Sequence, residues 1–191
     1  ARTAASRVGL GSSSTRRCSR DHADPDDGRH RGCPTVEGGG TFEKLGRLFT
    51  DADRQFPGAV WSLSIGWGCE KISTAADLAP IRSALRRAHR NGTSAFDASG
   101  DTAGLECKGG EDFSTPPGPD DIGVDAVASL PEMTSVGGTT LSTDPQGRWL
   151  AEHAWTDVPM SQGTSGGVTT LFDRPLFQRA VSTPRDSAHR L

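Results

Sequence analysis

Phe96-Asp-Ala-Ser-Gly-Asp-Thr-Ala-Gly104 is the stretch on which the prediction of the fold depends. Small and apolar residues lead into Gly100, and one carboxylate, Asp101, follows before a second glycine ends the segment. This pattern predicts a buried strand that ends abruptly in a turn of small residues. In open α/β sheets, functional side chains gather at the carboxyl ends of parallel strands. We therefore expect Asp101 to lie at the functional edge of such a sheet.

The residues before this stretch predict a strand, a helix and a second strand. Val60 begins an apolar run in Ala59-Val-Trp-Ser-Leu-Ser-Ile-Gly-Trp67, which indicates a strand covered on both faces, as in a parallel sheet. A helix is expected from about Asp77, with Asp77 as its N-cap, to Asn91-Gly92. Its buried stripe comprises Leu78, Ile81, Leu85 and Ala88. The strand Thr93–Ser99 follows, so we expect a right-handed crossover between parallel strands.

Other elements are expected on both sides of this unit. Thr41 is a good N-cap for a helix that Pro57-Gly58 ends. The buried face of that helix comprises Phe42, Leu45, Leu48, Phe49 and Ala52. Lys108–Gly123 is rich in Gly, Pro and Asp and indicates a surface loop. Met133–Val136 indicates a short strand, and Asp144-Pro-Gln-Gly147 indicates a turn between two further strands.

Length and charge limit the possible functions. A chain of 191 residues is long enough for one domain with its own core. A formal net charge of −3 gives no reason to expect a nucleic acid or a membrane surface as partner. No apolar run is long enough to span a membrane, and the first ten residues lack the apolar core of a secretory signal. The chain begins with Ala1, so we expect a processed or truncated product and leave its location unassigned.

The chain divides into three parts by composition. Residues 1–40 contain no Phe, Trp, Ile or Met and are expected to be disordered, because they cannot bury enough apolar surface to offset the entropy of ordering. Residues 41–181 are expected to fold, and residues 182–191 form a polar tail. Cysteine and histidine side chains in the first part are spaced unlike a common zinc finger, so accidental spacing is preferred to a zinc site. They are Cys18, His22, His30 and Cys33.

The remaining cysteines, Cys69 and Cys107, lie in the part that is expected to fold. In an oxidising compartment they could form a disulfide, and two buried thiols are the alternative. No Cys-x-x-Cys motif decides between these readings.

Four motifs between about residue 42 and residue 180 occur in an order that is informative. They are Val60-Trp-Ser-Leu-Ser-Ile-Gly-Trp-Gly68 with Glu70; Ala98-Ser-Gly-Asp-Thr102; Leu130-Pro-Glu-Met-Thr-Ser-Val-Gly-Gly-Thr-Thr-Leu141; and Glu152 and Trp155 followed by Gly163–Gly167 and Phe172–Gln178. Together they resemble the sedolisins, a family of serine-carboxyl peptidases. The resemblance implies an α/β fold with a subtilisin-like parallel sheet and flanking helices, incomplete in this chain and preceded by the disordered N-terminal segment.

The resemblance also implies a role for Asp101. In the family a serine attacks the peptide carbonyl, and a glutamate oriented by an aspartate takes the serine proton, which confines activity to acidic pH. The aspartate of the family's Ser-Gly-Asp turn donates to the developing oxyanion while it is protonated. Asp101 matches that position, although Thr102 and Ala103 stand where Ser-Gly is usual. The alternative is an ordinary aspartate at a strand end that accepts from nearby backbone amides.

The other catalytic residues of the family have no counterpart by pattern. Glu-x-x-x-Asp, which would carry the base and its orienting aspartate, occurs nowhere in the chain. Gly163-Thr-Ser165 superficially resembles the nucleophile turn, but its neighbours place it in an earlier Gly-rich segment, so we do not expect Ser165 to be the nucleophile. The family's calcium loop has no counterpart either. Calcium is expected for a complete family domain, and no metal site is expected in this chain.

These features predict a fragment of a serine-carboxyl endopeptidase domain whose substrates are peptides or proteins. The family's acidic proteolysis is expected of a complete domain and not of this chain alone. We favour a truncated or frame-disturbed product of a peptidase gene as the origin of the chain, and a degenerate homologue that has lost catalysis is the alternative. The alternative function is a non-catalytic peptide-binding module derived from a peptidase. An extracellular location is expected from the resemblance only.

Overall fold

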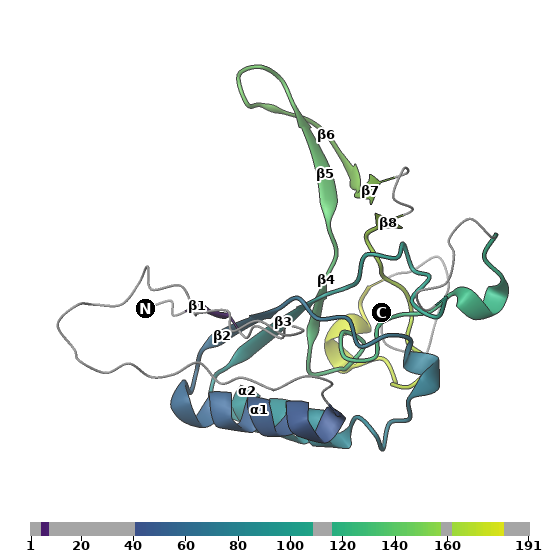
Figure 1. Cartoon of the computed structure of the whole chain (residues 1–191). Helices are drawn as coiled ribbons and strands as arrows, with labels where there is room; N and C mark the ends of the chain where they lie inside the picture. The colour runs from purple at the N-terminus through teal and green to yellow at the C-terminus, as the bar shows by residue number, and fades with distance from the viewer. Residues whose placement is uncertain (1–4, 8–40, 109–115, 158–161, 182–191) are drawn as a thin grey trace, which may run out of the picture. The chain divides into compact units, whose positions relative to one another are not determined.

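The computed structural model describes residues 5–7, 41–108, 116–157 and 162–181 (Figure 1). Contacts divide the chain into two compact units: Ala1–Ser64 with Ala79–Ala95, and Ile65–Leu78 with Phe96–Leu191. Of the segment expected to be disordered, the structure describes only Ala5–Arg7, which form strand β1. The four candidate zinc ligands and residues 182–191 lie outside the described residues.

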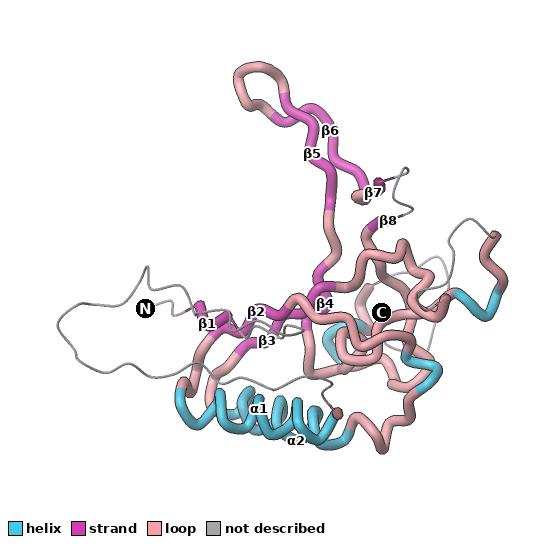
Figure 2. Tube along the Cα trace, viewed as in Figure 1, coloured by secondary structure: helices cyan, strands magenta, loops and turns pink. Residues whose placement is uncertain are grey.

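The first unit contains two helices side by side, α1 (Phe42–Gln55) and α2 (Ala79–Arg90), drawn in cyan in Figure 2. As predicted, Thr41 caps α1, and its side chain accepts a hydrogen bond from the Lys44 amide at 3.3 Å. The predicted stripe on α2 is confirmed, because Ile81, Leu85 and Ala88 are fully buried. The spacing of the apolar residues therefore predicts both helices and their buried faces.

Strand β2 (Val60–Leu63) packs its Trp61 side against α1, where the Trp61 and Phe49 rings stack with centroids 5.4 Å apart. Trp61 and Leu63 are buried, whereas Val60 is 41% exposed and Ser62 is exposed. The prediction of a strand covered on both faces is therefore wrong, and the strand is also shorter than expected. Among the described residues of this unit, packing buries only the face that carries Trp61 and Leu63, so side chains alternate between core and solvent.

The start of α2 also differs from the prediction. Helix α2 begins at Ala79, and Asp77 belongs to a turn just before it. The Thr74 amide and hydroxyl both donate to Asp77 Oδ2, at 2.8 and 2.7 Å, and the Asp77 amide donates to Thr74 Oγ1. Asp77 therefore closes a turn with Thr74 instead of capping the helix. Thr and Asp are both common N-cap residues, so the sequence alone does not tell whether Asp77 caps the helix or pairs with Thr74.

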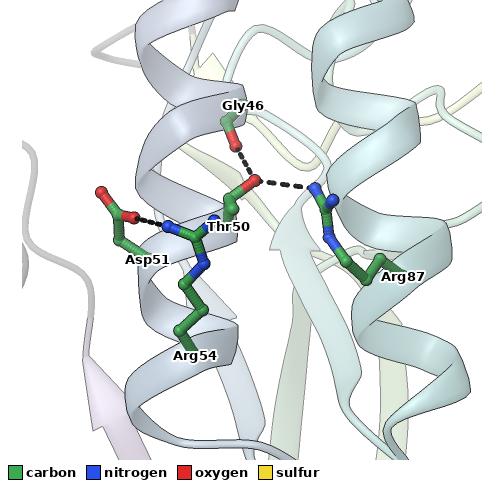
Figure 3. Close-up of polar contacts among 5 residues, drawn as sticks. All are labelled: Gly46, Thr50, Asp51, Arg54 and Arg87. Atoms are coloured by element: carbon green, nitrogen blue, oxygen red, sulfur yellow. Dashed lines mark hydrogen bonds and ion pairs between the residues drawn. The ribbon is translucent and has the colours of Figure 1, made fainter.

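Polar contacts join the two helices (Figure 3). Thr50 Oγ1 donates to the Gly46 carbonyl of its own helix at 2.9 Å and accepts from Arg87 Nη2 of α2 at 3.0 Å. The exposed Arg54–Asp51 pair, at 3.4 Å, adds little because solvent screens it. Thr50 is therefore the polar residue in this view that links α1 to α2.

At Gly46, helix α1 lies in close contact with the start of helix α2, which makes this position a test of the packing. A Cβ at this position would lie 2.8 Å from the backbone C and O atoms of Pro80. Alanine in place of glycine normally favours a helix by about 1 kcal/mol. Here Gly46→Ala should instead destabilise the protein by about 1–3 kcal/mol, because the added methyl overpacks the contact. Urea unfolding measures the change.

The matched control is Gly66→Ala, because a Cβ at Gly66 meets no atom within 4 Å. We expect this variant to stay within about 0.5 kcal/mol of the wild type. A Gly46→Ala protein at least as stable as the wild type would contradict the close contact between α1 and α2.

A parallel sheet runs through the strands in the order β1-β2-β3-β4. In the first unit β1 pairs parallel with β2, and the Ser94 amide at the start of β3 (Ser94–Ala98) donates to the Ala59 carbonyl. In the second unit β3 pairs parallel with β4 (Thr134–Val136), with Phe96 opposite Thr134. Both predicted strands are therefore confirmed, and β3 ends where the predicted turn begins.

The second unit also contains smaller elements. Strands β5 (Thr139–Thr143) and β6 (Trp149–Ala154) form an antiparallel hairpin around the predicted turn, drawn in green in Figure 1. The other elements are strands β7 (Thr156–Asp157) and β8 (Gln162–Gly163), and the 3₁₀ helices η2 (Glu70–Ile72), η3 (Pro119–Asp121) and η4 (Leu176–Gln178). No helix among the described residues is long and apolar enough to cross a membrane.

Cys69 and Cys107 form a disulfide, which decides between the two alternatives left open by the sequence. Cys69 directly precedes η2, and Cys107 lies in the loop after the Asp101 turn. The Cys107 amide also donates to the Asp121 carbonyl at 3.1 Å. The disulfide and this hydrogen bond fix the start of the loop that follows Asp101.

Candidate functional site

The candidate site is the turn that follows β3, and its carboxylate is exposed. Ser99 is buried at the end of the strand, whereas Asp101 reaches solvent. The Asp101 carbonyl accepts from the Gly163 amide at 2.9 Å. Its side-chain carboxylate accepts no hydrogen bond from the residues that the structure describes. This counts against an aspartate whose purpose is to bind nearby backbone amides, and it leaves the carboxyl group free to meet a ligand.

The turn has an unusual backbone. Gly100, Ala103 and Gly104 have positive φ angles of 113°, 56° and 85°. Ala103 is the only such residue other than glycine among the described residues. A Cβ on Gly100 would collide with the Glu106 side chain and lie 3.0 Å from Ser165 Oγ. Such a backbone persists only where its surroundings hold it in place.

Residues 163–165 run beside the turn and supply that support. The Ala103 amide donates to the Gly163 carbonyl at 2.9 Å, and the Ser165 amide donates to the Gly100 carbonyl at 3.0 Å. Together with the hydrogen bond to the Asp101 carbonyl, these contacts attach both ends of the turn to one segment. Ser165 itself is only 6% exposed, so the structure places it under the turn and not at the surface.

A cavity of about 180 Å³ lies beside the turn, within the second unit. Its polar lining is mainly hydroxyl groups, joined by one carboxylate: Ser99, Asp125, Ser129, Ser135 and Thr169. The Ser99 hydroxyl has no hydrogen-bond partner among the described residues. The sequence did not reveal this cavity, because four separate segments of the chain form its walls.

Two buried aspartates lie close to this cavity, and their charge states matter for stability. Asp97, in β3, is 1% exposed, and neither of its carboxylate oxygens makes a hydrogen bond with the described residues. Burial and then the charge of Asp125 raise its pKa to about 7, while the nearby amides of Ile65 and Ala98 oppose the shift. Asp97 is therefore largely protonated below neutral pH.

Asp125 is equally buried, but its carboxylate oxygens have hydrogen-bond partners. It accepts hydrogen bonds from the amides of Trp67, Val127 and Ala128 at 2.6, 2.8 and 3.0 Å. Burial raises the pKa of Asp125, and these three amides oppose the shift. The sequence reasoning singled out neither aspartate. The available signal was an ionisable residue inside a strand of otherwise small or apolar residues, Ala95-Phe-Asp-Ala98.

Glu70, the acidic residue of the first motif, is buried and holds two segments of the chain together. It is 1% exposed and accepts hydrogen bonds from the Thr169 hydroxyl, the Thr170 amide and the Thr170 hydroxyl. Glu70 therefore attaches the segment around Thr169 to the turn that contains the disulfide. Among the described residues, no group of three or more His, Cys, Asp or Glu side chains is placed to hold a metal ion. The described residues thus offer no ligand set for the calcium that is expected of a complete family domain.

Comparison with solved structures gives an informative similarity. No family model matches the chain, and no curated protein matches it. Among solved structures, it is similar to Pseudomonas sedolisin, a serine-carboxyl proteinase complexed with two molecules of pseudo-iodotyrostatin, at 27% sequence identity and a TM-score of 0.64. The match covers 77% of this chain and 39% of that chain, so this chain spans less than half of the proteinase. The fold of this chain is therefore the sedolisin-like α/β fold that the four motifs imply.

Proposed function

We propose that this chain is a peptidase-type domain that binds peptide or protein substrates, and that Asp101 is its oxyanion-hole acid. One observation carries the proposal: an exposed carboxyl group, without a partner among the described residues, follows β3 on a strained and well-supported turn in a sedolisin-like fold. The reaction is the hydrolysis of a peptide bond by a serine-carboxyl endopeptidase.

The chemistry of this role requires a neutral carboxylic acid. When a nucleophile attacks a peptide carbonyl, negative charge develops on the carbonyl oxygen. A protonated Asp101 donates a hydrogen bond to that oxygen, whereas the ionised form repels it. The donor must also be held in place before the reaction, because preorganised donors stabilise the transition state most effectively. The described hydrogen bonds of the turn supply this support.

Cleavage also requires a nucleophile and a base, and we assign neither to this chain. The 191 residues contain no Glu-x-x-x-Asp pattern. The Ser165 hydroxyl lies under the turn and is already engaged with the amides of Thr102 and Gly104 and with Glu106. We therefore propose that this chain alone binds peptides without cleaving them, and that acidic proteolysis belongs to a domain with the complete catalytic set.

A binding and cleavage assay tests this proposal. The purified chain is titrated with a reduced, carboxymethylated protein at about pH 4 by calorimetry, and the products are examined by mass spectrometry. We expect saturable binding, no cleavage, and affinity about tenfold weaker in Asp101→Ala, which corresponds to one lost hydrogen bond. Asp173→Ala is the matched control, because Asp173 is also an exposed aspartate of the second unit and should not affect affinity.

The outcomes separate the parts of the proposal. Absence of saturable binding would overturn it. Binding with equal affinity in Asp101→Ala would remove Asp101 from the site. Cleavage that Asp101→Ala abolishes would support a peptidase and contradict the expected inactivity of this chain. A non-catalytic binding module predicts binding that is indifferent to whether Asp101 carries its proton.

A further inference from the structure

We propose that Ser165 and Glu106 are positioning residues that hold the Asp101 turn in its binding geometry, and that they are not a nucleophile and its base. This inference rests on the proposed role of Asp101, because it explains what keeps that carboxyl group in place. The two side chains lie 59 residues apart in the sequence and meet directly under the turn.

Ser165 Oγ joins three parts of the turn. It accepts hydrogen bonds from the backbone amides of Thr102 and Gly104, both at 3.2 Å. It donates its proton to Glu106 Oε1 at 2.7 Å. The two amides flank Ala103, which is the alanine with a positive φ angle. Ser165 therefore binds the amides on both sides of the most strained residue in the turn.

Glu106 completes the arrangement from the other side. Its Oε1 atom accepts from the Ser165 hydroxyl and also from Thr102 Oγ1, at 2.5 Å. Glu106 is itself held in place, because the next residue forms the Cys69–Cys107 disulfide. The amide of Gly123 also donates to the Gly104 carbonyl at 3.0 Å, which ties the turn to the same loop. The disulfide therefore fixes Glu106, Glu106 binds Ser165, and Ser165 binds the amides of the turn.

The hydrogen bonds of Ser165 argue against a catalytic role. A hydroxyl oxygen has two lone pairs and one proton. Both lone pairs accept from the amides of Thr102 and Gly104, and the proton points to Glu106. A nucleophile needs a free lone pair directed at the substrate carbonyl, and this oxygen has none. The hydrogen bond between Ser165 and Glu106 resembles that of a nucleophile and its base, but here it holds the backbone of the turn in place.

Two substitutions of Glu106 distinguish positioning from catalysis. Glu106→Gln keeps an acceptor oxygen for both hydroxyl groups but cannot act as a base. Glu106→Ala removes the acceptor. Positioning predicts that Glu106→Gln keeps the amide exchange and the peptide affinity of the wild type and that Glu106→Ala changes both. A side chain that acted only as a general base would leave both quantities unchanged in both variants, because neither depends on proton transfer.

The experiment uses the full chain and two readouts. Amide hydrogen exchange at Thr102 and Gly104, followed by NMR, reports the turn itself, and calorimetry with the carboxymethylated protein at about pH 4 reports binding. In Ser165→Ala and Glu106→Ala we expect exchange of both amides to be about tenfold faster and peptide affinity to be about tenfold lower. Glu106→Gln should stay within about twofold of the wild type in both readouts. Ser142→Ala, in the hairpin, is the control for loss of a serine hydroxyl.

Two results would overturn the inference: unchanged amide exchange in Ser165→Ala, or a Glu106→Gln variant that fails as completely as Glu106→Ala. If Ser165→Ala does not fold, the comparison of the two Glu106 variants still decides. If exchange responds as expected while the wild-type chain binds no peptide, the attachment of the turn is supported and the proposed function is overturned. The two proposals therefore fail in distinguishable ways.

Discussion

Asp97→Asn should stabilise the protein at about pH 8 by about 2–4 kcal/mol and should remove most of the dependence of stability on pH. Asp97 is buried in β3 without a hydrogen-bond partner among the described residues. Its pKa rises from 3.8 to about 7 in the folded state, first through burial and then through the charge of Asp125. Asparagine has nearly the same shape and carries no charge, so it avoids the cost of ionisation.

The direction of the pH effect follows from this raised pKa. Below 3.8 the carboxyl group is protonated in both the folded and the unfolded chain, so it has no effect on stability. As the pH rises from 3.8 to about 7, only the unfolded chain ionises, and the free energy of unfolding falls. Above about 7 the loss is complete. The raised pKa of Asp125 acts in the same direction, so these two buried carboxyl groups favour a protein that is more stable at about pH 4 than at about pH 8.

Urea unfolding at about pH 4, 6 and 8 measures this effect in the wild type and in Asp97→Asn. Asp125→Asn is the contrasting variant, because Asp125 accepts from three backbone amides and its loss should destabilise at every pH. A wild type equally stable at the acidic and the alkaline end would contradict the account of Asp97. So would an Asp97→Asn protein that is less stable than the wild type at the alkaline end.

Glu70→Ala should destabilise the protein by on the order of 3 kcal/mol or more. The substitution leaves three donors of Thr169 and Thr170 without their acceptor, and Thr169 is buried. Unsatisfied buried donors each cost about 1–3 kcal/mol, which exceeds the net gain of an ordinary hydrogen bond. Glu70→Gln keeps one acceptor oxygen and should lie between alanine and the wild type. Thermal or urea unfolding measures the series.

The control for this series is Glu152→Ala. Glu152 lies in the exposed hairpin, where it accepts from Thr139 Oγ1 at 2.5 Å. Water replaces that hydrogen bond easily, so we expect a loss of less than about 0.5 kcal/mol. Equal losses in Glu70→Ala and Glu152→Ala would show that Glu70 does not anchor the Thr169 segment.

The helices and strands that precede Asp101 in the sequence could be predicted because their signals are local. Thr41 lies next to the helix that it caps, and the apolar stripe of α2 is visible in twelve consecutive residues. Two predictions were wrong for one reason: the burial of both faces of β2 and the capping of α2 by Asp77. Whether Val60 is covered, and whether Thr74 or Asp77 controls the turn before α2, depends on the surrounding packing and backbone and not on residue type.

The position of Asp101 was predictable, but its support was not. A glycine and a carboxylate after a strand of small residues indicate a functional turn. Nothing near Asp101 in the sequence indicates that Ser165 binds two amides of that turn, because the two segments are more than sixty residues apart. Asp97 could be placed in a strand, yet its raised pKa depends on burial and then on the charge of Asp125, and both come from other parts of the chain.

The central claim is that Asp101 donates a hydrogen bond as a neutral acid to a bound peptide, and its pH dependence tests this most directly. Peptide affinity is measured by calorimetry from about pH 3 to about pH 7 for the wild type and for Asp101→Asn. Both proteins keep Asp97, so the difference between them isolates Asp101. We predict that wild-type affinity falls as the pH rises, while Asp101→Asn, whose amide donates at every pH, keeps its affinity. Wild-type affinity that does not change with pH, or that falls in parallel with the variant, would contradict the claim.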